Sequence, residues 1–484
     1  MSRVVIFLGV LALTSCSSVP NLAGEPAEIF PVAPDAPATW AATGVSGEVP
    51  ISDWLAQFDD PVMAELVSEA LAANPSIRSQ YYVVQATRAQ ARSAYGRSLP
   101  NVSVSGTAGG TSTYVEVAGS DDRTNNSTFG LGADLSWEAD LWGRVSAGVD
   151  AAEADLSADE ADLAAARLSI AAETAIAWID LNEALAQERV AVQTFEARDN
   201  ALGLTERRFS RGLTDALDVR TARTTLASSE AAIAARRQAS GNATRRLEVL
   251  LGRYPQAALD APADIPSLEP IPSAGNPVLL LARRPDVAAA EARVRASGLR
   301  AEQARLALLP GLRITGSVST SEEDFVDALD PVRVAARLIA SLTAPVFNGG
   351  ALAADRDAAL ALARSSVESY AATALTAWRE VEDALAADSL LAQQEDAQAR
   401  ALEEARLAED LATRQYTNGL VSIFNLIDSQ TRRLNAESNL IAARSARASN
   451  RVRYHLALGG GLPVPDQQVS AVNGITSPEE AFLP

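Results

Sequence analysis

Two residues in this chain carry the side chains that most often act as nucleophiles, bases or soft metal ligands: a single cysteine, Cys16, and a single histidine, His455. One residue of each kind is too few for a Cys/His metal site. A Ser–His or Cys–His nucleophile would equally depend on this one histidine as its base. His455 lies near a predicted helix end, where we expect it to be solvated. No phosphate-cradling glycine loop is present, and the carboxylates are scattered along helical faces. The sequence therefore predicts a protein that is not an enzyme and holds no metal or cofactor.

Cys16 is positioned for a modification of the chain rather than for catalysis. Arg3 provides a positive charge, and the apolar stretch 4–13 that follows is too short for a bilayer, which needs about 20 residues. Leu13–Cys16 (LTSC) resembles the lipobox of bacterial lipoproteins, whose thiol receives a diacylglycerol after the signal is cut before it. The alternative is an ordinary signal peptide with an incidental cysteine. We expect residues 1–15 to be a lipoprotein signal peptide and Cys16 to carry the lipid. Ser17, in place of Asp, is typical of an outer-membrane address.

The chain is internally duplicated. Arg208–Leu213 (RFSRGL) recurs as Gln415–Leu420 (QYTNGL), 207 residues further on. The same shift relates Leu251-Gly252 to Leu458-Gly459. A duplication this regular indicates two structurally equivalent halves. We expect the following division: tether 16–60, first repeat 61–254, Pro-rich linker 255–277, second repeat 278–461 and C-terminal tail 462–484.

Each half contains two segments in which apolar and polar residues alternate. The predicted strands cover about 101–113, 127–138, 311–320 and 333–344. Strands of roughly ten residues with one apolar face are typical of membrane-spanning barrels, although soluble hairpins packed on helices show the same pattern. Four strands cannot close a barrel, and the smallest closed barrels have about 8. The membrane interpretation therefore requires two chains, giving 8 strands, or three chains, giving 12.

Most of the remaining chain is predicted to be long helix. A helix from Pro61 is expected to break at Asn74-Pro75, because proline disfavours helix in the residue before it. From 143 to 209 the chain is almost free of Pro and Gly, and apolar residues recur at steps of seven, which marks coiled-coil packing. The residues at these steps are Val149, Leu156, Leu163, Ile170, Ala177, Ala184 and Ala191. Turns at Arg211–Leu213 and Asn418–Leu420 give each half one helical hairpin. The net charge of −20 argues against nucleic-acid binding.

Four sets of segments follow one another along the chain: Leu135–Arg144, Leu281–Val287 with Ala290-Glu291, Ala307–Pro310 with Ile314–Gly316, and Tyr416–Leu420 with Leu426–Gln430. In this order they resemble segments of the outer membrane efflux protein family, and most closely of its lipoprotein branch, which serves RND-type multidrug pumps. The resemblance implies a mainly α chain with a pair of β-hairpins that assembles as a homotrimer. Its 12-stranded outer-membrane β-barrel would continue as a long periplasmic α-helical barrel. The implied partners are a periplasmic adaptor (membrane fusion protein), an inner-membrane RND pump and outer-membrane lipid.

The resemblance also implies roles for residues at the two hairpin turns. Those expected to dock an adaptor are Arg208, Gly212, Leu213, Gly419 and Leu420. Those expected to act as gate charges are Asp218, Arg220 and Asp428. The alternative is that the first set are only turn residues, since glycine suits the positive φ of a turn, and the second a solvated helix face. Where the family usually has Arg before the tip aromatic, the second copy has Gln415.

Three other functions remain open from the sequence. The exit duct of a type I protein secretion system belongs to the same class, but the lipobox and the Arg283–Asp286 segment favour efflux. A lipid-anchored periplasmic coiled-coil scaffold without a pore would not need four alternating strands. A lipid-anchored hydrolase would lack a histidine or cysteine for its chemistry. A drug-efflux exit channel is therefore the leading prediction.

Overall fold

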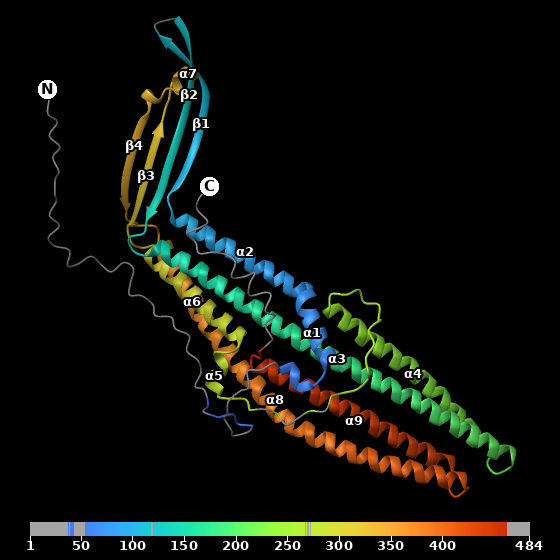
Figure 1. The fold of residues 1–484 in the computed structure, drawn as a ribbon. Helices are drawn as coiled ribbons and strands as arrows, with labels where there is room; N and C mark the ends of the chain where they lie inside the picture. The colour runs from blue at the N-terminus through green and yellow to red at the C-terminus, as the bar shows by residue number, and fades with distance from the viewer. Residues whose placement is uncertain are drawn as a thin grey trace. The chain divides into compact units, whose positions relative to one another are not determined.

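The computed structural model describes residues 37, 39–42, 54–117, 120–266, 268, 271 and 273–461. The expected signal peptide, Cys16 and the C-terminal tail lie outside this range. The described chain is mostly helical with one small antiparallel sheet (Figure 1). It divides into two compact units, each built from both halves of the sequence. We call them the sheet unit, Gln85–Ala158 with Glu291–Ser369, and the helical unit, formed by the described parts of Ala33–Val84, Asp159–Ala290 and Tyr370–Pro484.

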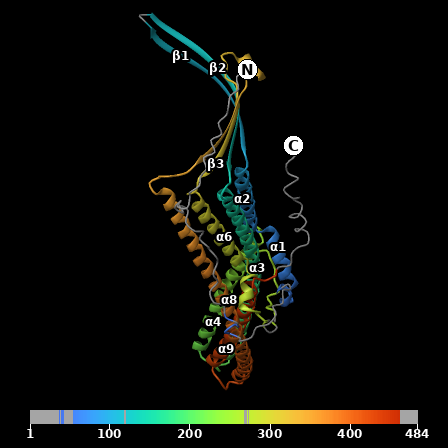
Figure 2. The ribbon, with the colours of Figure 1, turned by 90° about the vertical axis from the view of Figure 1, so that its left-hand side faces the viewer.

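The sheet has four strands in the order β1-β2-β3-β4. They are β1 (Asn101–Val117), β2 (Ser120–Ala139), β3 (Gly311–Ser319) and β4 (Ala335–Thr343). β1 and β2 exceed the ranges expected from the sequence because their pairing continues beyond those ranges as far as Val117↔Ser120. Figure 2 shows this hairpin projecting beyond β3. Among the described strands, β1 and β4 each pair on one side only, so the sheet has two free edges.

The strand register separates the two faces of the sheet as the sequence predicts. One row crosses the sheet as Val102, Leu135, Gly316 and Leu338, and the next apolar row runs through Val104, Ala133, Val318 and Ala336. Between them, a row on the opposite face runs through Ser103, Asp134, Ser317 and Arg337. The apolar face is exposed in this chain, with 80% of Val104 and 74% of Leu338 accessible to solvent.

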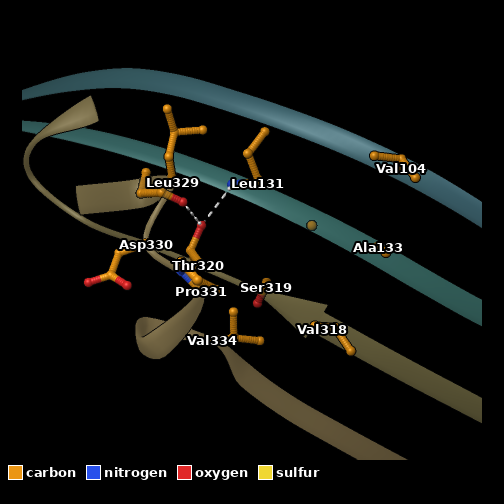
Figure 3. Close-up of a pocket in the computed structure, with 12 residues that line it drawn as sticks. Val104, Leu131, Ala133, Val318, Ser319, Thr320, Leu329, Asp330, Pro331 and Val334 are labelled. Carbon is orange, nitrogen blue, oxygen red and sulfur yellow. Dashed lines mark hydrogen bonds between the residues drawn. The ribbon is translucent and has the colours of Figure 1, made fainter. Parts of the chain in front are cut away.

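The connection from β3 to β4 folds back onto the sheet. It contains the short helices α7 (Phe325–Ala328) and η2 (Pro331–Arg333). Thr320 Oγ1 donates to the carbonyl of Ala328 at 2.8 Å and accepts from the N–H of Leu131 at 3.2 Å (Figure 3). Together with the apolar face of the strands, the connection lines an open pocket of about 290 Å³. The connection is thus a folded element held to β2.

Helices lead into and out of the sheet at its one end. α2 (Pro75–Ser98) precedes β1, α6 (Pro285–Leu306) precedes β3, α3 (Arg144–Ser210) follows β2, and α8 (Ala351–Thr417) follows β4. The side chain of Asp140, four residues before α3, caps the start of that helix by accepting hydrogen bonds from the backbone N–H groups of Val145 at 3.0 Å and Ser146 at 2.8 Å. The predicted break at Asn74 is confirmed, because α1 (Pro61–Ala73) ends before it and α2 begins after it.

The helical unit contains two helical hairpins, one from each half of the sequence. α4 (Ala216–Leu250) lies beside α3, and α9 (Ile423–Ala457) beside α8; α5 (Pro277–Leu281) is short (Figure 1). None of the seven predicted seam residues of α3 is exposed. The largest core cluster packs Met63, Trp178 and Leu247 together. No helix of the described chain is long and apolar enough to cross a membrane.

Equivalent contacts recur in the two hairpins at the 207-residue shift. Glu188 on α3 accepts from Arg237 at 3.3 Å and from Ser240 at 2.7 Å on α4. Its counterpart Glu395 on α8 accepts from Arg444 at 3.2 Å and from Arg447 at 3.0 Å on α9. The duplication read from the sequence is therefore also present in the packing.

The N-terminal segment is not a free tether where it is described. Trp40 is 1% exposed and donates from its indole Nε1 to the carbonyl of Gly275 at 2.8 Å. The 3-10 helix η1 (Trp54–Phe58) enters the main core. His455 stacks on Trp54 at 5.9 Å between ring centroids and is 6% exposed. The expectation of a solvated histidine was wrong, because the packed N-terminal segment covers it.

Candidate functional site: the tips of the helical hairpins

Both hairpin tips end their first helix with the same glycine cap. In the first, Leu213 N–H donates to the Arg208 carbonyl and Gly212 N–H to that of Phe209, both at 2.9 Å. In the second, Leu420 and Gly419 make the equivalent bonds at 2.9 and 3.0 Å. This is the Schellman pattern, which needs a residue of positive φ, and φ is +71° at Gly212 and +77° at Gly419. The two glycines therefore form the turns.

Apolar side chains are exposed around these turns. Leu213 is 61% exposed and Leu420 73%. Three further apolar side chains that the sequence reasoning missed are also exposed: Phe209, Leu217 and Phe424. The repeat could have pointed to two of them, since Leu217 and Phe424 are related by the 207-residue shift. We call these five residues the tip surface. Exposed apolar patches commonly mark protein-interaction sites.

Arg208 links the two tips instead of projecting from one of them. Its Nη1 donates to the carbonyl of Tyr416 at 2.7 Å, and its guanidinium lies 4.9 Å from the centre of the Tyr416 ring. The Tyr416 hydroxyl is 2.9 Å from Thr205 Oγ1 on α3, and Tyr416 is 1% exposed. Arg208, Thr205 and Tyr416 form what we call the tip clamp. A carbonyl at a helix C-terminus and an aromatic face both favour a cation.

A second arginine, ten residues before Arg208 on α3, joins the same two hairpins, but through α9 instead of α8. Arg198 on α3 donates from Nη1 to Gln430 Oε1 at 2.8 Å and from Nη2 to Thr431 Oγ1 at 2.7 Å on α9. Burial lowers the pKa of the Arg198 guanidinium, and the charge of Glu409 partly opposes this. Between the two arginines lies a small apolar core that includes Ala201 and Leu426. No pattern in the sequence points to Arg198, because its partners come from the other repeat.

The structure does not bring the three predicted gate charges together. Asp218, in the first turn of α4, accepts a hydrogen bond from the hydroxyl of Thr214, which precedes that helix. Arg220 is exposed on the same helix. Asp428 forms an exposed ion pair with Arg432, one turn along α9, at 2.8 Å. Within this chain the three are separate charges on two helices. The described residues contain no group of three or more His, Cys, Asp or Glu able to hold a metal ion.

Comparisons with known proteins agree with this architecture. The chain matches the model of the outer membrane efflux protein family over residues 66–253 and 276–460. It is 30% identical to the outer membrane protein OprJ of Pseudomonas aeruginosa, over 93% of this chain and 94% of that one. It is 29% identical to the pyoverdine export outer membrane protein OpmQ of the same organism, over 88% and 91% of the two chains. The solved structure of the outer-membrane channel OprN superposes with a TM-score of 0.80 at 28% identity, covering 89% of this chain and 99% of that one. A match that includes both repeats, both strand pairs and both hairpins shows that this chain belongs to the outer membrane efflux protein family.

Proposed function

We propose that this protein is the outer-membrane exit channel of a tripartite efflux pump. It passively conducts small molecules from an inner-membrane RND transporter and a periplasmic adaptor to the exterior. The observation that carries the proposal is the family match over both repeats, combined with a sheet that has one exposed apolar face and two free edges. Such a protein performs no chemistry of its own, and the pump supplies the energy.

The sheet supports a barrel shared between chains. Free backbone N–H and C=O groups at a sheet edge are not tolerated in lipid, so β1 of one copy must pair with β4 of the next. Four strands from each of three chains give the 12-stranded barrel that the family resemblance implies. Its exposed apolar face would contact lipid, and the face with Asp134 and Arg337 would line the water-filled interior. Acylated Cys16 would add a second anchor in the same membrane.

The tip surface supports docking of the adaptor. The residues proposed to dock the adaptor are Gly212, Leu213, Gly419 and Leu420, together with Arg208, which supports them by joining the two tips. The glycines shape the two turns, the leucines present exposed apolar area, and Arg208 fixes one tip against the other. A partner that covers the leucines buries apolar surface that this chain leaves in water.

A channel through the envelope needs a closed resting state, since a permanently open tube would leak. The tip clamp supports such a state because it ties the two hairpins of one chain together. Asp218, Arg220 and Asp428 remain the proposed gate charges. In a trimer each would occur as a ring of three, and rings of like charge tune ion flow.

A native mass spectrum of the mature protein, extracted in detergent from the outer membrane of a Gram-negative host, tests the proposal. We expect the mass of three chains, each heavier than the peptide by a lipid modification, and conductance steps when the trimer enters a planar bilayer. A lipid-free monomer that does not conduct would overturn the channel and leave a periplasmic scaffold. A lipid-free conducting trimer would overturn only the acylation of Cys16.

A further inference from the structure

The end of the sheet at which the helices attach carries an unusual set of side chains. The part of α2 that belongs to the sheet unit, residues 85–98, contains three arginines, Arg88, Arg92 and Arg97, and no acidic residue, in a chain of net charge −20. Arg92 and Arg97 are exposed, and among the described residues neither side chain makes a hydrogen bond or an ion pair. Two unpaired guanidinium groups therefore lie just before β1 begins at Asn101.

Aromatic and apolar side chains surround the same end of the sheet. Tyr95 lies one helical turn from Arg92, on the same face of α2, and is 53% exposed. Trp142 and Phe347, in the connections that leave β2 and β4, are also exposed. The Trp142 indole donates to the Pro310 carbonyl at 2.7 Å, just before β3. Aromatic rings with a polar tip concentrate at the level of lipid headgroups.

One contact places the end of α2 on the apolar side of the sheet. Trp137 stands on the apolar face, in the row with Ile314 and Ala340, and its indole Nε1 donates to the Ser98 carbonyl at 2.9 Å. Ser98 is the last residue of α2. The exposed arginines of that helix therefore adjoin the face that would contact lipid, at the level where the strands emerge from the bilayer.

We propose that this end of the sheet binds anionic phospholipid headgroups of the periplasmic leaflet, with Arg92 and Arg97 contacting the phosphates and Tyr95 and Trp142 lying at headgroup depth. The inference rests on the proposed function, in that the sheet must span the membrane. Guanidinium forks match phosphate geometry, and no acidic side chain on this part of α2 competes for them. The partner is a membrane lipid, since the surface combines charge with apolar area next to the strands.

The test compares lipids retained by the full-length trimer. The wild type, R92Q/R97Q and the control R236Q are purified in detergent, mixed with equal amounts of phosphatidylglycerol and phosphatidylcholine, and examined by native mass spectrometry. Arg236 is a fair control because it is exposed on α4 in the helical unit and, among the described residues, has no side-chain partner. Each arginine near an anionic surface contributes about 5-fold in affinity, so losing two should reduce phosphatidylglycerol retention by roughly 30-fold.

The outcomes separate this inference from the proposed function. A trimer that prefers phosphatidylglycerol, loses the preference in R92Q/R97Q and keeps it in R236Q supports the surface. Equal retention of both lipids by the wild type, or an unchanged preference in the double variant, overturns it while the channel stands. An equal loss in R236Q also overturns it, because net charge rather than position would then decide. A wild type that forms no trimer refutes the channel itself.

Discussion

Replacing Arg208 by glutamine should open the resting channel. Glutamine is the residue that the second repeat has at the equivalent position, Gln415. The change removes a charge-assisted hydrogen bond to the Tyr416 carbonyl, about 1.5 kcal/mol, and a cation–π contact, counted at its lower limit of about 0.5 kcal/mol. If the opened state lacks both contacts, a loss of about 2 kcal/mol raises the open-to-closed ratio by roughly 30-fold per chain.

The assay is single-channel recording of the purified trimer in planar bilayers, with open probability as the readout. R414Q provides the control, because Arg414 also lies near the tip of α8 but, within the described part of the chain, pairs only with Asp410 on its own helix, at 2.9 Å. We expect R208Q to raise the open probability steeply and R414Q to leave it near the wild-type value. An R208Q channel that stays as closed as the wild type would refute the role of the clamp in gating, whatever its effect on stability.

Three further predictions concern the stability of the assembled protein, measured as its thermal unfolding midpoint. Gly252→Ala should lower the midpoint clearly more than Gly212→Ala. Both glycines have a φ of +71°, a conformation that costs an alanine about 1–2 kcal/mol. At Gly252 the new Cβ would in addition lie 2.8 Å from the Ala73 carbonyl oxygen, whereas at Gly212 it would meet no atom within 4 Å. Equal shifts would contradict the close approach. Burial raises the pKa of the Glu248 carboxyl, but hydrogen bonds from the backbone N–H groups of the linker outweigh this and hold its pKa below the usual 4.5. The ionised carboxylate therefore stabilises the folded protein fully above pH 4.5, and this contribution is lost as the pH falls. Glu248→Gln should therefore lower the midpoint at pH 7 and flatten its dependence at acidic pH, and an unaltered acid profile would count against the linker contacts. Burial lowers the pKa of His455 to about 4, so the folded state binds fewer protons than the unfolded state and stability decreases by about 3 kcal/mol between pH 6.5 and 4. His455→Gln should remove that decrease, and a variant with the wild-type pH profile would show that another group is responsible.

The features that could be predicted from the sequence follow from local rules. Alternation along a strand assigns Leu135 and Leu338 to one face and Asp134 and Arg337 to the other, and the register confirms this because side chains of a strand point alternately to opposite faces. Gly212 and Gly419 mark the tips because a helix that reverses direction needs a residue of positive φ. Repetition at a fixed shift then shows that both halves share one architecture.

Other features depend on partners that lie far away in the chain. The carbonyl of Tyr416 accepts a hydrogen bond from Arg208, which lies 208 residues earlier in the chain. His455 is buried by the segment that begins at Trp54, and it is hydrogen-bonded to Gln57, 398 residues away. Periodicity reports only which face of an element is apolar, and it carries no information on which element covers that face. The sequence by itself therefore determined the repeats, the strand faces and the turns of this protein. Only the tertiary structure decided which side chains connect the hairpins and which groups are removed from water, because those contacts arise from packing between distant segments.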